Sequence, residues 1–428
     1  MPDKLPFLAA INALLSRGWE AGWWPRPTLD PEALESEACR RERANAAPGE
    51  EWREAFGLLV RELEDTAALS PLGRQIANGQ LVTLLRMRIR AERLLRVHPE
   101  VRERPLRAPV VILGHMRSGT TRLHRLLAQD PQFAHTRHFE SLEPVPSRGR
   151  RLRAGAVQAF LEQANPALAA IHPTAPLEPE EEWGLHSFSW HGAQMIAQWH
   201  VPEFAAFQRR RELAVPYAEF AALLRLIGWS RRERADKPWL LKSPQFLGDL
   251  HAVLRQFPDA RLLCLRRDPV AVVGSSASLV WNQRRLHSNH ADPRAIGRES
   301  LELTAWRERS ARAARACHPQ VPQLEIGFDE VSDDWEAAVR RIYDFLDLSL
   351  SATALARMRR YMARPSPHAE HRYRLEDFDL SEDEVRQIMA PEPAERPFLL
   401  APAANSTRGS ERVCRYAPAG KVNGVAMP

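Results

Sequence analysis

The chain has 428 residues, of which 44% are hydrophobic and 27% charged, an ordinary composition for a soluble globular protein with an ample core. No stretch reaches the roughly 18 uninterrupted apolar residues that a membrane span needs, so the sequence predicts no integral span. The net charge of +6 is modest, and acidic residues are interleaved with arginine clusters such as 209–211 and 231–232, which favours solvated helix faces over a nucleic-acid surface.

Arginine is the usual cation of this protein, and lysine is rare. Only four of the 60 basic residues are lysines: Lys4, Lys237, Lys242 and Lys421. A lysine at a site position therefore counts for more than it would elsewhere. Four cysteines are spread along the chain: Cys39, Cys264, Cys317 and Cys414. Because they form no C-x-x-C pair, we expect reduced thiols in a cytoplasmic chain.

Residues 1–105 contain no strand-like run and predict an all-helical N-terminal region. The apolar periodicity predicts helices over Leu5–Leu15, Glu32–Arg43, Glu51–Leu63 and Leu69–Val97. The first of these is too short to span a bilayer. Two interpretations of it stay open: packing onto the main domain, which we favour, and a peripheral membrane contact through Leu8, Ile11, Trp19, Trp23 and Trp24.

The segment 109–133 contains the strongest local pattern of the chain. Val110–Gly114 is a short β-branched run, typical of a strand buried on both faces. A turn follows, and then Leu123, Leu126 and Leu127 at helical spacing. A strand, a glycine-bounded loop and a helix point unpaired N–H groups and the positive end of the helix dipole at one place. This arrangement predicts an anion site.

Gly114–Thr121 reads G-x-x-x-x-G-T-T, which is close to the nucleotide-binding P-loop pattern. Thr120 stands where a P-loop has its lysine, so the site lacks a charge that a triphosphate needs. Arg117 could supply a planar cation, and the hydroxyls of Thr120 and Thr121 could add donors. The loop therefore favours a phosphate-like group with fewer charges than a triphosphate.

The rest of the chain alternates predicted strands and helices. After a charged connector at 148–153 we expect a helix at 156–170, a proline-broken acidic loop at 171–183, and a helix carrying Trp183, Phe188 and Trp190. The remaining expected strands are 239–242, 260–265 and 323–327, and the remaining helices are 216–229, 247–257, 270–280 and 334–346.

This order predicts an α/β fold, a P-loop-like parallel sheet flanked by helices, with ligands at the carboxyl ends of the strands. We expect the helical region 1–105 to pack on an α/β domain of residues 106–400. The tail 401–428 has no periodicity and is rich in Ala, Gly, Ser and Pro, which predicts disorder.

Two strand ends carry further candidate ligands. Arg267 follows the end of the strand 260–265, and Ser275 lies on the next helix. A guanidinium and a hydroxyl could therefore hold one phosphate from two sides. Without the loop, a surface arginine beside a helix-capping Asp268 would explain the same residues. Lys242 ends the neighbouring strand, where a plain surface lysine is the alternative.

Three motifs in this order resemble those of sulfotransferases that use 3′-phosphoadenosine-5′-phosphosulfate (PAPS), in particular the bacterial branch. They are RSGTT at 117–121, LKSP at 241–244, and RDP at 267–269 with Ser275 after it, and the resemblance runs from roughly residue 10 to 400. It implies that the 5′-phosphosulfate lies on Arg117, Ser118, Gly119, Thr120 and Thr121. It also implies a 3′-phosphate on Arg267, Ser275 and Arg372, and Lys242 beside the sulfuryl group as a catalytic cation with Arg117.

The general base is the point where the chain departs from this family. The family often has a histidine two residues after the proline of LKSP, and here that residue is Phe246. A substitute could come from the segment 178–182, which includes Glu180 and Glu181 and resembles the family's E-P-E-E segment, through a carboxylate whose pKa burial raises. His172 also matches a family position. The alternatives are that the glutamates form a solvated acidic turn and that His172 is a packed histidine without a catalytic role.

We therefore predict a sulfotransferase that moves a sulfuryl group from PAPS to a hydroxyl or amine of a small-molecule acceptor. Aromatic and aliphatic residues in 183–229 favour a lipophilic acceptor. The pairs His287-x-x-His290 and His368-x-x-His371 lack a third ligand, so we predict no metal. The alternatives are a P-loop kinase or nucleotide phosphohydrolase, and a relative that binds the nucleotide without turnover. No oligomeric state follows from the sequence.

Overall fold

The computed structural model describes residues 6–364 and 373–390. At its centre is a five-stranded sheet in the order β2-β3-β1-β4-β5, and every neighbouring pair is parallel. The strands are β1 Val110–Leu113, β2 Ala134–His135, β3 Trp239–Lys242, β4 Arg261–Arg266 and β5 Gln323–Gly327. The predicted α/β fold is confirmed. Arg372 and the tail 401–428 lie outside the described residues.

Strand β1 is the middle strand and is buried along its whole length. Val111 packs into the core that the sheet shares with the N-terminal helices, whereas Ile112 packs into the core on the opposite face. Since successive side chains of a strand point to opposite faces, a strand covered on both sides must be apolar throughout. The run of β-branched residues therefore fixes β1 at the centre, with its carboxyl end leading into the loop 114–119.

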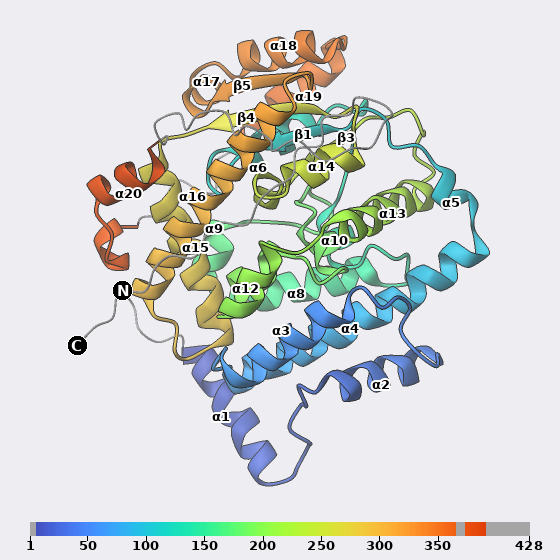
Figure 1. The fold of residues 1–428 in the computed structure, drawn as a ribbon, viewed down its shortest axis with the longest axis vertical. Helices are drawn as coiled ribbons and strands as arrows, with labels where there is room; N and C mark the ends of the chain where they lie inside the picture. The colour runs from blue at the N-terminus through green and yellow to red at the C-terminus, as the bar shows by residue number, and fades with distance from the viewer. Residues whose placement is uncertain (1–5, 365–372, 391–428) are drawn as a thin grey trace, which may run out of the picture.

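The helices cover both faces of the sheet and extend well beyond it (Figure 1). The N-terminal helices are α1 Pro6–Glu20, α2 Pro31–Glu42, α3 Arg53–Asp65, α4 Pro71–Val97 and α5 Glu100–Glu103. The middle helices are α6 Thr120–Leu127, α7 His138–Leu142, α8 Arg150–Ala164, α9 Pro166–Ile171, α10 Trp183–Ser187, α11 Ala193–Gln198, α12 Pro202–Gln208, α13 Ala214–Ser230, η1 Pro244–Leu247 and α14 Leu250–Gln256. The remaining helices are α15 Pro269–His287, α16 Pro293–Cys317, α17 Phe328–Asp333, α18 Trp335–Leu346, α19 Ala352–Met362, η2 Leu375–Phe378 and α20 Glu382–Met389.

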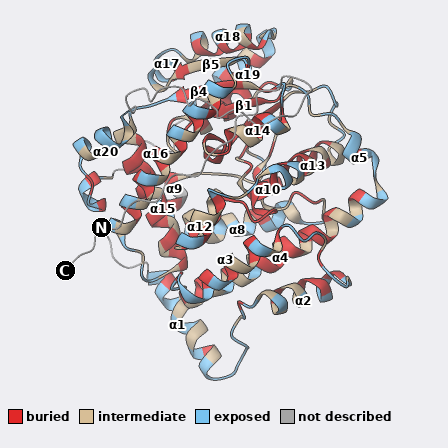
Figure 2. Cartoon of the chain, in the orientation of Figure 1, coloured by how far each residue is buried: buried red, intermediate tan, exposed pale blue. Residues whose placement is uncertain are grey.

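The first four helices lie at the end of the molecule away from β5 and α18, and their inward faces are buried (Figures 1 and 2). Helix α1 packs on the rest of the protein through Leu8, which is 5% exposed, as the favoured interpretation requires. Trp23, just after it, is 65% exposed. Within the described residues, no helix combines the length and apolar character needed to cross a membrane. The division at residue 105 stays a prediction.

Several predicted helices have different limits in the structure. Helix α8 begins at Arg150, inside the stretch predicted as a connector, because Gly149 turns the chain with a φ of 75°. The predicted helix 156–170 is two helices, since Asn165 accepts a hydrogen bond from the N–H of Leu168 and caps a new one. The predicted helix through Trp190 ends at Ser187. Strand β2 and helices α16, α19 and α20 were not predicted.

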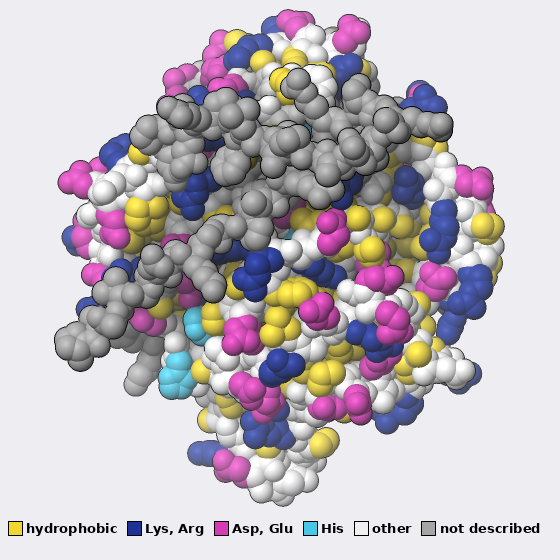
Figure 3. Space-filling view, viewed as in Figure 1, with side chains coloured by type: hydrophobic (Ala, Val, Ile, Leu, Met, Phe, Trp, Pro, Cys, Tyr) yellow, Lys and Arg dark blue, Asp and Glu magenta, His cyan; other side chains and the backbone are white. Residues whose placement is uncertain are grey.

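The arginine clusters are solvated in part, as the sequence favoured: Arg209, Arg210 and Arg232 are exposed, whereas Arg211 and Arg231 are not. Arg211 donates to the backbone oxygens of Ser189 (2.9 Å) and Trp190 (3.0 Å). The side chain of Arg231 is 9% exposed and forms an ion pair with Glu140. These arginines fold back on the protein because nearby carbonyl and carboxylate groups need donors. On the face in Figure 3, basic and acidic side chains are interspersed among hydrophobic ones.

One buried ion pair joins the N-terminal helices to the core. Arg88 of α4 is 4% exposed and donates to both carboxylate oxygens of Glu219 of α13, at 2.6 and 3.1 Å. Its Nη1 also donates to the backbone oxygen of Phe188 at 2.9 Å. This pair therefore ties residues more than a hundred positions apart.

We predict that Arg88→Met lowers the free energy of unfolding by about 3 kcal/mol, because it leaves the partly buried carboxylate of Glu219 without its cation and the backbone oxygen of Phe188 without this donor. Arg96→Met, on an exposed position of the same helix, is the matched control and should change it by less than about 0.5 kcal/mol. Urea unfolding at neutral pH measures both values. Equal stability of the two variants would contradict a structural role for the pair.

Candidate active site

The loop between β1 and α6 has the geometry of an anion site. Arg117 has a φ of 68° and Gly119 a φ of 87°, so the chain turns sharply before the first N–H groups of α6. A Cβ on Gly119 would lie 2.8 Å from the Phe328 ring, and one on Gly114 would lie 2.6 Å from Ser118 Oγ. Both glycines are therefore required for close packing, and the loop leaves the start of α6 facing outward.

The Arg117 side chain lies against the start of helix α15. Its Nε donates to Ser275 Oγ at 3.0 Å and its Nη1 to the backbone oxygen of Ile171 at 2.9 Å. Arg267 donates to the backbone oxygen of Arg117, whereas its neighbour Arg266 pairs with Glu325. The structure thus brings the predicted phosphosulfate loop and the predicted 3′-phosphate residues together. Burial lowers the pKa of Arg117, and the charge of Arg267 lowers it further.

Two aromatic residues stand beside these cations. The guanidinium of Arg267 lies 4.0 Å from the ring centroid of Phe328, and Tyr373 donates to the backbone oxygen of Ala271 at 2.9 Å. Both rings line the same cavity as Arg117 and Ser275. Sequence reasoning missed Phe328. Its position directly after strand β5, at the ligand edge of a parallel sheet, was the available signal.

Lys242, at the end of β3, is buried behind the cavity wall and is 1% exposed. Its ammonium group donates to Thr121 Oγ1 at 3.1 Å and forms an ion pair with Glu181. Thr121 and Glu181 both line the cavity. A cation at this position is held between the loop after β1 and the acidic loop before α10. The predicted juxtaposition of Lys242 with the start of α6 is therefore present.

The three consecutive glutamates of the acidic loop differ in their surroundings. Glu180 is fully buried, and although burial acts to raise its pKa, the nearby His172 and His138 rings hold that pKa well below its usual value. Burial raises the pKa of Glu182 to about 8, even though this carboxyl accepts the Lys242 backbone N–H at 2.8 Å. Glu181 alone of the three lines the cavity. Glu182 belongs to the segment predicted to supply the base, and burial raises its pKa, but its side chain does not line the cavity.

His172 lies at the cavity, whereas Phe246, at the position where the family often has histidine, does not. His172 lines the cavity, and its Nε2 lies 3.4 Å from Glu180 Oε1. Phe246 is fully buried in η1, with its ring centroid 5.5 Å from that of His186. This position packs into the core, so its side chain cannot meet a substrate. The loop 172–182 supplies two titratable groups to the cavity wall, His172 and Glu181.

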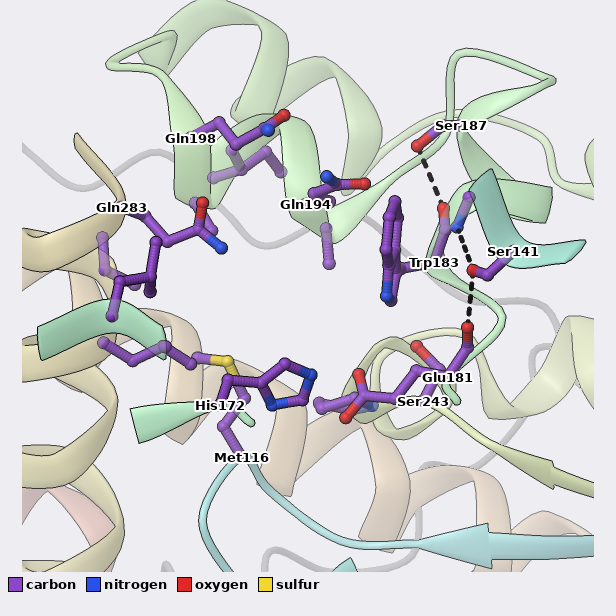
Figure 4. Close-up of a pocket in the computed structure, with 18 of the residues that line it drawn as sticks. Met116, Ser141, His172, Glu181, Trp183, Ser187, Gln194, Gln198, Ser243 and Gln283 are labelled. Atoms are coloured by element: carbon purple, nitrogen blue, oxygen red, sulfur yellow. Dashed lines mark hydrogen bonds between the residues drawn. The ribbon is translucent and has the colours of Figure 1, made fainter. Parts of the chain in front are cut away.

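A cavity of about 1310 Å³ connects these groups. Of the predicted site residues, it is lined by Arg117, Gly119, Thr120, Thr121, His172, Glu181, Arg267 and Ser275, while Ser118 and Lys242 lie behind its wall. Figure 4 shows His172, Glu181 and Trp183 pointing into it, with Gln194 and Gln283 across from them. Apolar side chains from four helices line the rest: Ile76, Leu84, Met87, Phe160, Leu161, Ile196, Leu279, Val280 and Leu286.

Known proteins share both the sequence pattern and the fold. The profile of the sulfotransferase family matches residues 109–352, more than half of the chain. Two curated relatives, from Mycobacterium bovis and Mycobacterium tuberculosis, are each an omega-hydroxy-beta-dihydromenaquinone-9 sulfotransferase. Each is 24% identical over 278 residues, which cover 62% of this chain and 70% of the relative.

Two solved structures have the same fold. A sulfotransferase of Mycobacterium tuberculosis H37Rv has a TM-score of 0.72 at 25% identity, covering 85% of this chain and 99% of that one. A sulfotransferase of Mycobacterium avium has a TM-score of 0.73 at 24% identity, covering 84% and 94%. The resemblance inferred from three short motifs is thereby confirmed over most of the chain. The protein is an enzyme that transfers a sulfuryl group, and it belongs to the sulfotransferase family.

Proposed function

We propose that the donor is PAPS, with its phosphosulfate on the loop 114–121 and its 3′-phosphate on Arg267 and Ser275. The observation that carries this proposal is the hydrogen bond from Arg117 Nε to Ser275 Oγ, which joins the two predicted phosphate sites in one cavity. The α6 N-terminus and two guanidinium groups complement a ligand with two separate anionic ends. Phe328 and Tyr373 beside them suit an aromatic base between those ends.

On this proposal the acceptor oxygen attacks sulfur in line while the bond from sulfur to the bridging phosphate oxygen breaks. The negative charge that develops on the bridging oxygen needs a cation. Arg117 belongs to the loop, and Lys242 donates to Thr121 at its end, so these two are the candidates. The acceptor loses its proton to a group of the loop 172–182, either Glu181 or His172, since both line the cavity.

The acceptor is, in our proposal, a small and largely apolar molecule with a hydroxyl group. The apolar walls from α4, α8, α11 and α15 support this, as does the name of the mycobacterial relative, which describes action on a hydroxylated menaquinone. We also propose a reducing, cytoplasmic setting. The buried thiols of Cys39 and Cys264 are free, which supports it.

We predict that 3′,5′-adenosine diphosphate raises the melting temperature of the protein and that ATP does so much less. Arg267→Ala and Ser275→Ala should each weaken binding of this ligand by roughly 1.5 to 3 kcal/mol, because each removes a hydrogen bond to a charged group. Adenosine 5′-phosphosulfate, which lacks the 3′-phosphate, should be affected much less. Calorimetry measures both ligands, with Arg266→Ala as the neighbouring control. Equal losses for the two ligands would refute the assignment.

Arg117→Met and Lys242→Met should slow the chemical step by more than they weaken donor binding. Methionine keeps the chain length and removes the charge that would meet the bridging oxygen in the transition state. Single-turnover rates at saturating PAPS separate this effect from ground-state binding. If both variants keep the wild-type rate constant at saturation, the two cations only hold the donor and the catalytic role is wrong.

Glu181→Gln or His172→Gln should lower turnover about a hundredfold, as expected on loss of a general base, with donor affinity retained. Leu177→Ala is the control, because Leu177 belongs to the same loop but is 57% exposed and does not line the cavity. Steady-state rates at saturating donor give the comparison. Full activity in both glutamine variants would place the base elsewhere.

A further inference from the structure

Arg307 is a buried cation on the cavity wall that no proposed step uses. It lies on α16 and is 5% exposed. Ser300 and Thr304, seven and three positions before it, line the same cavity, as expected for one face of a helix.

No hydrogen bond or ion pair joins Arg307 to any of residues 6–364 or 373–390, and this sets it apart. The other arginines that are at least nine-tenths buried all have partners. Arg88 donates to Glu219, Arg125 to the backbone oxygens of Pro173 and Pro179, and Arg284 to Glu299. An unpaired buried charge is costly, so a protein that pairs its other buried arginines leaves this one for a ligand.

The carboxylates nearest to Arg307 are already engaged. Asp249 accepts hydrogen bonds from Tyr217 at 2.9 Å and Gln245 at 3.0 Å, and Glu181 pairs with Lys242. Burial lowers the pKa of Arg307 to about 10, so it is still a cation at neutral pH. The missing partner is therefore an anion that enters through the cavity.

The charges that act on Arg307 differ from those that act on Arg117. Those that act on Arg307 are Asp249, Arg209 and Glu181, whereas Arg117 feels Arg267, Tyr373 and Glu181. Glu181 is the one charge common to both sets. Arg209 also lines the cavity and lies 5.4 Å from the Trp306 ring centroid, so a second cation adds to the attraction.

We propose that Arg307 binds an anionic group of the acceptor, a carboxylate, sulfonate or phosphate, so that the acceptor is an acidic amphiphile with a hydroxyl to be sulfated. This inference rests on the proposed function and deepens it. The guanidinium fork matches a planar or tetrahedral oxyanion through paired hydrogen bonds. The apolar walls hold the chain that links this anion to the hydroxyl.

The test compares medium-chain ω-hydroxy fatty acids with their methyl esters, which keep the chain and hydroxyl and lose the charge. Calorimetry on the full chain, with 3′,5′-adenosine diphosphate bound, gives their affinities for the wild type, Arg307→Met and Arg309→Met. Arg309 is exposed on the same helix and does not line the cavity. We expect the wild type and Arg309→Met to bind at least one acid about tenfold tighter than its ester, as a charge-assisted bidentate contact gives. Arg307→Met should lose that preference and keep its affinity for the ester.

Equal binding of acid and ester by the wild type would overturn the proposal, as would an unchanged preference in Arg307→Met. Octyl sulfate is measured on the same variants as a mimic of the sulfated product. If Arg307→Met lost affinity for octyl sulfate and not for the acids, the proposal would also be overturned, because the anion would then belong to the product. Arg307→Lys keeps the charge and should retain part of the preference, which covers the case in which the methionine variant does not fold. Failure of the wild type to bind 3′,5′-adenosine diphosphate would count against the donor assignment instead.

Discussion

The cost of burying charge at the carboxyl edge of the sheet governs the organisation of this site. Lys242 and Glu180 are removed from water, and each lies against groups that compensate its charge. Lys242 forms an ion pair with Glu181, and Glu180 lies 3.8 Å from Arg125 and beside the rings of His172 and His138, which hold its pKa well below the usual value despite its burial. Glu182 has no such partner at its side chain, and burial raises its pKa to about 8. The loop 172–182 is held in place by these pairings, since Glu180 also accepts hydrogen bonds from Thr174 Oγ1 and from the backbone N–H of Glu181.

This pairing has a consequence for the chemistry. Lys242, beside the loop after β1, is already paired with Glu181. An arriving donor would therefore replace one anion by another at Lys242, and would not have to strip water from a hydrated cation. On the proposed mechanism, Lys242 turns from Glu181 to the donor, and Glu181 becomes available to accept a proton. Because the ammonium group of Lys242 is already in place, the site needs little reorganisation when the transition state forms. If Glu181 is the base of the proposed mechanism, donor binding and activation of the base are coupled through the Lys242–Glu181 ion pair.

On our proposal, the donor and acceptor parts of the cavity have different origins in the fold. The donor part comes from three strand ends, after β1, β4 and β5, which a parallel sheet brings to one edge. The acceptor part comes from helices far apart in sequence, including α4 of the N-terminal region and α16. Helices that cover an edge can change their facing residues without disturbing the sheet. The acceptor part is therefore where relatives with one fold can differ in specificity.

The sequence by itself determined the parts of the protein whose cause is local. The β-branched run before Gly114 specified the central strand, the glycines and Arg117 specified the loop, and the strand ends at Lys242 and Arg267 specified further cations, because strand burial and tight turns each leave a short-range pattern. The tertiary structure alone decided which charges are buried and what they meet. Arg307 lies in a polar helix that periodicity did not predict, and Phe328 meets Gly119 across more than two hundred residues. A charged residue has the same letter whether water or a cavity surrounds it, so its burial depends on long-range packing that no local pattern records.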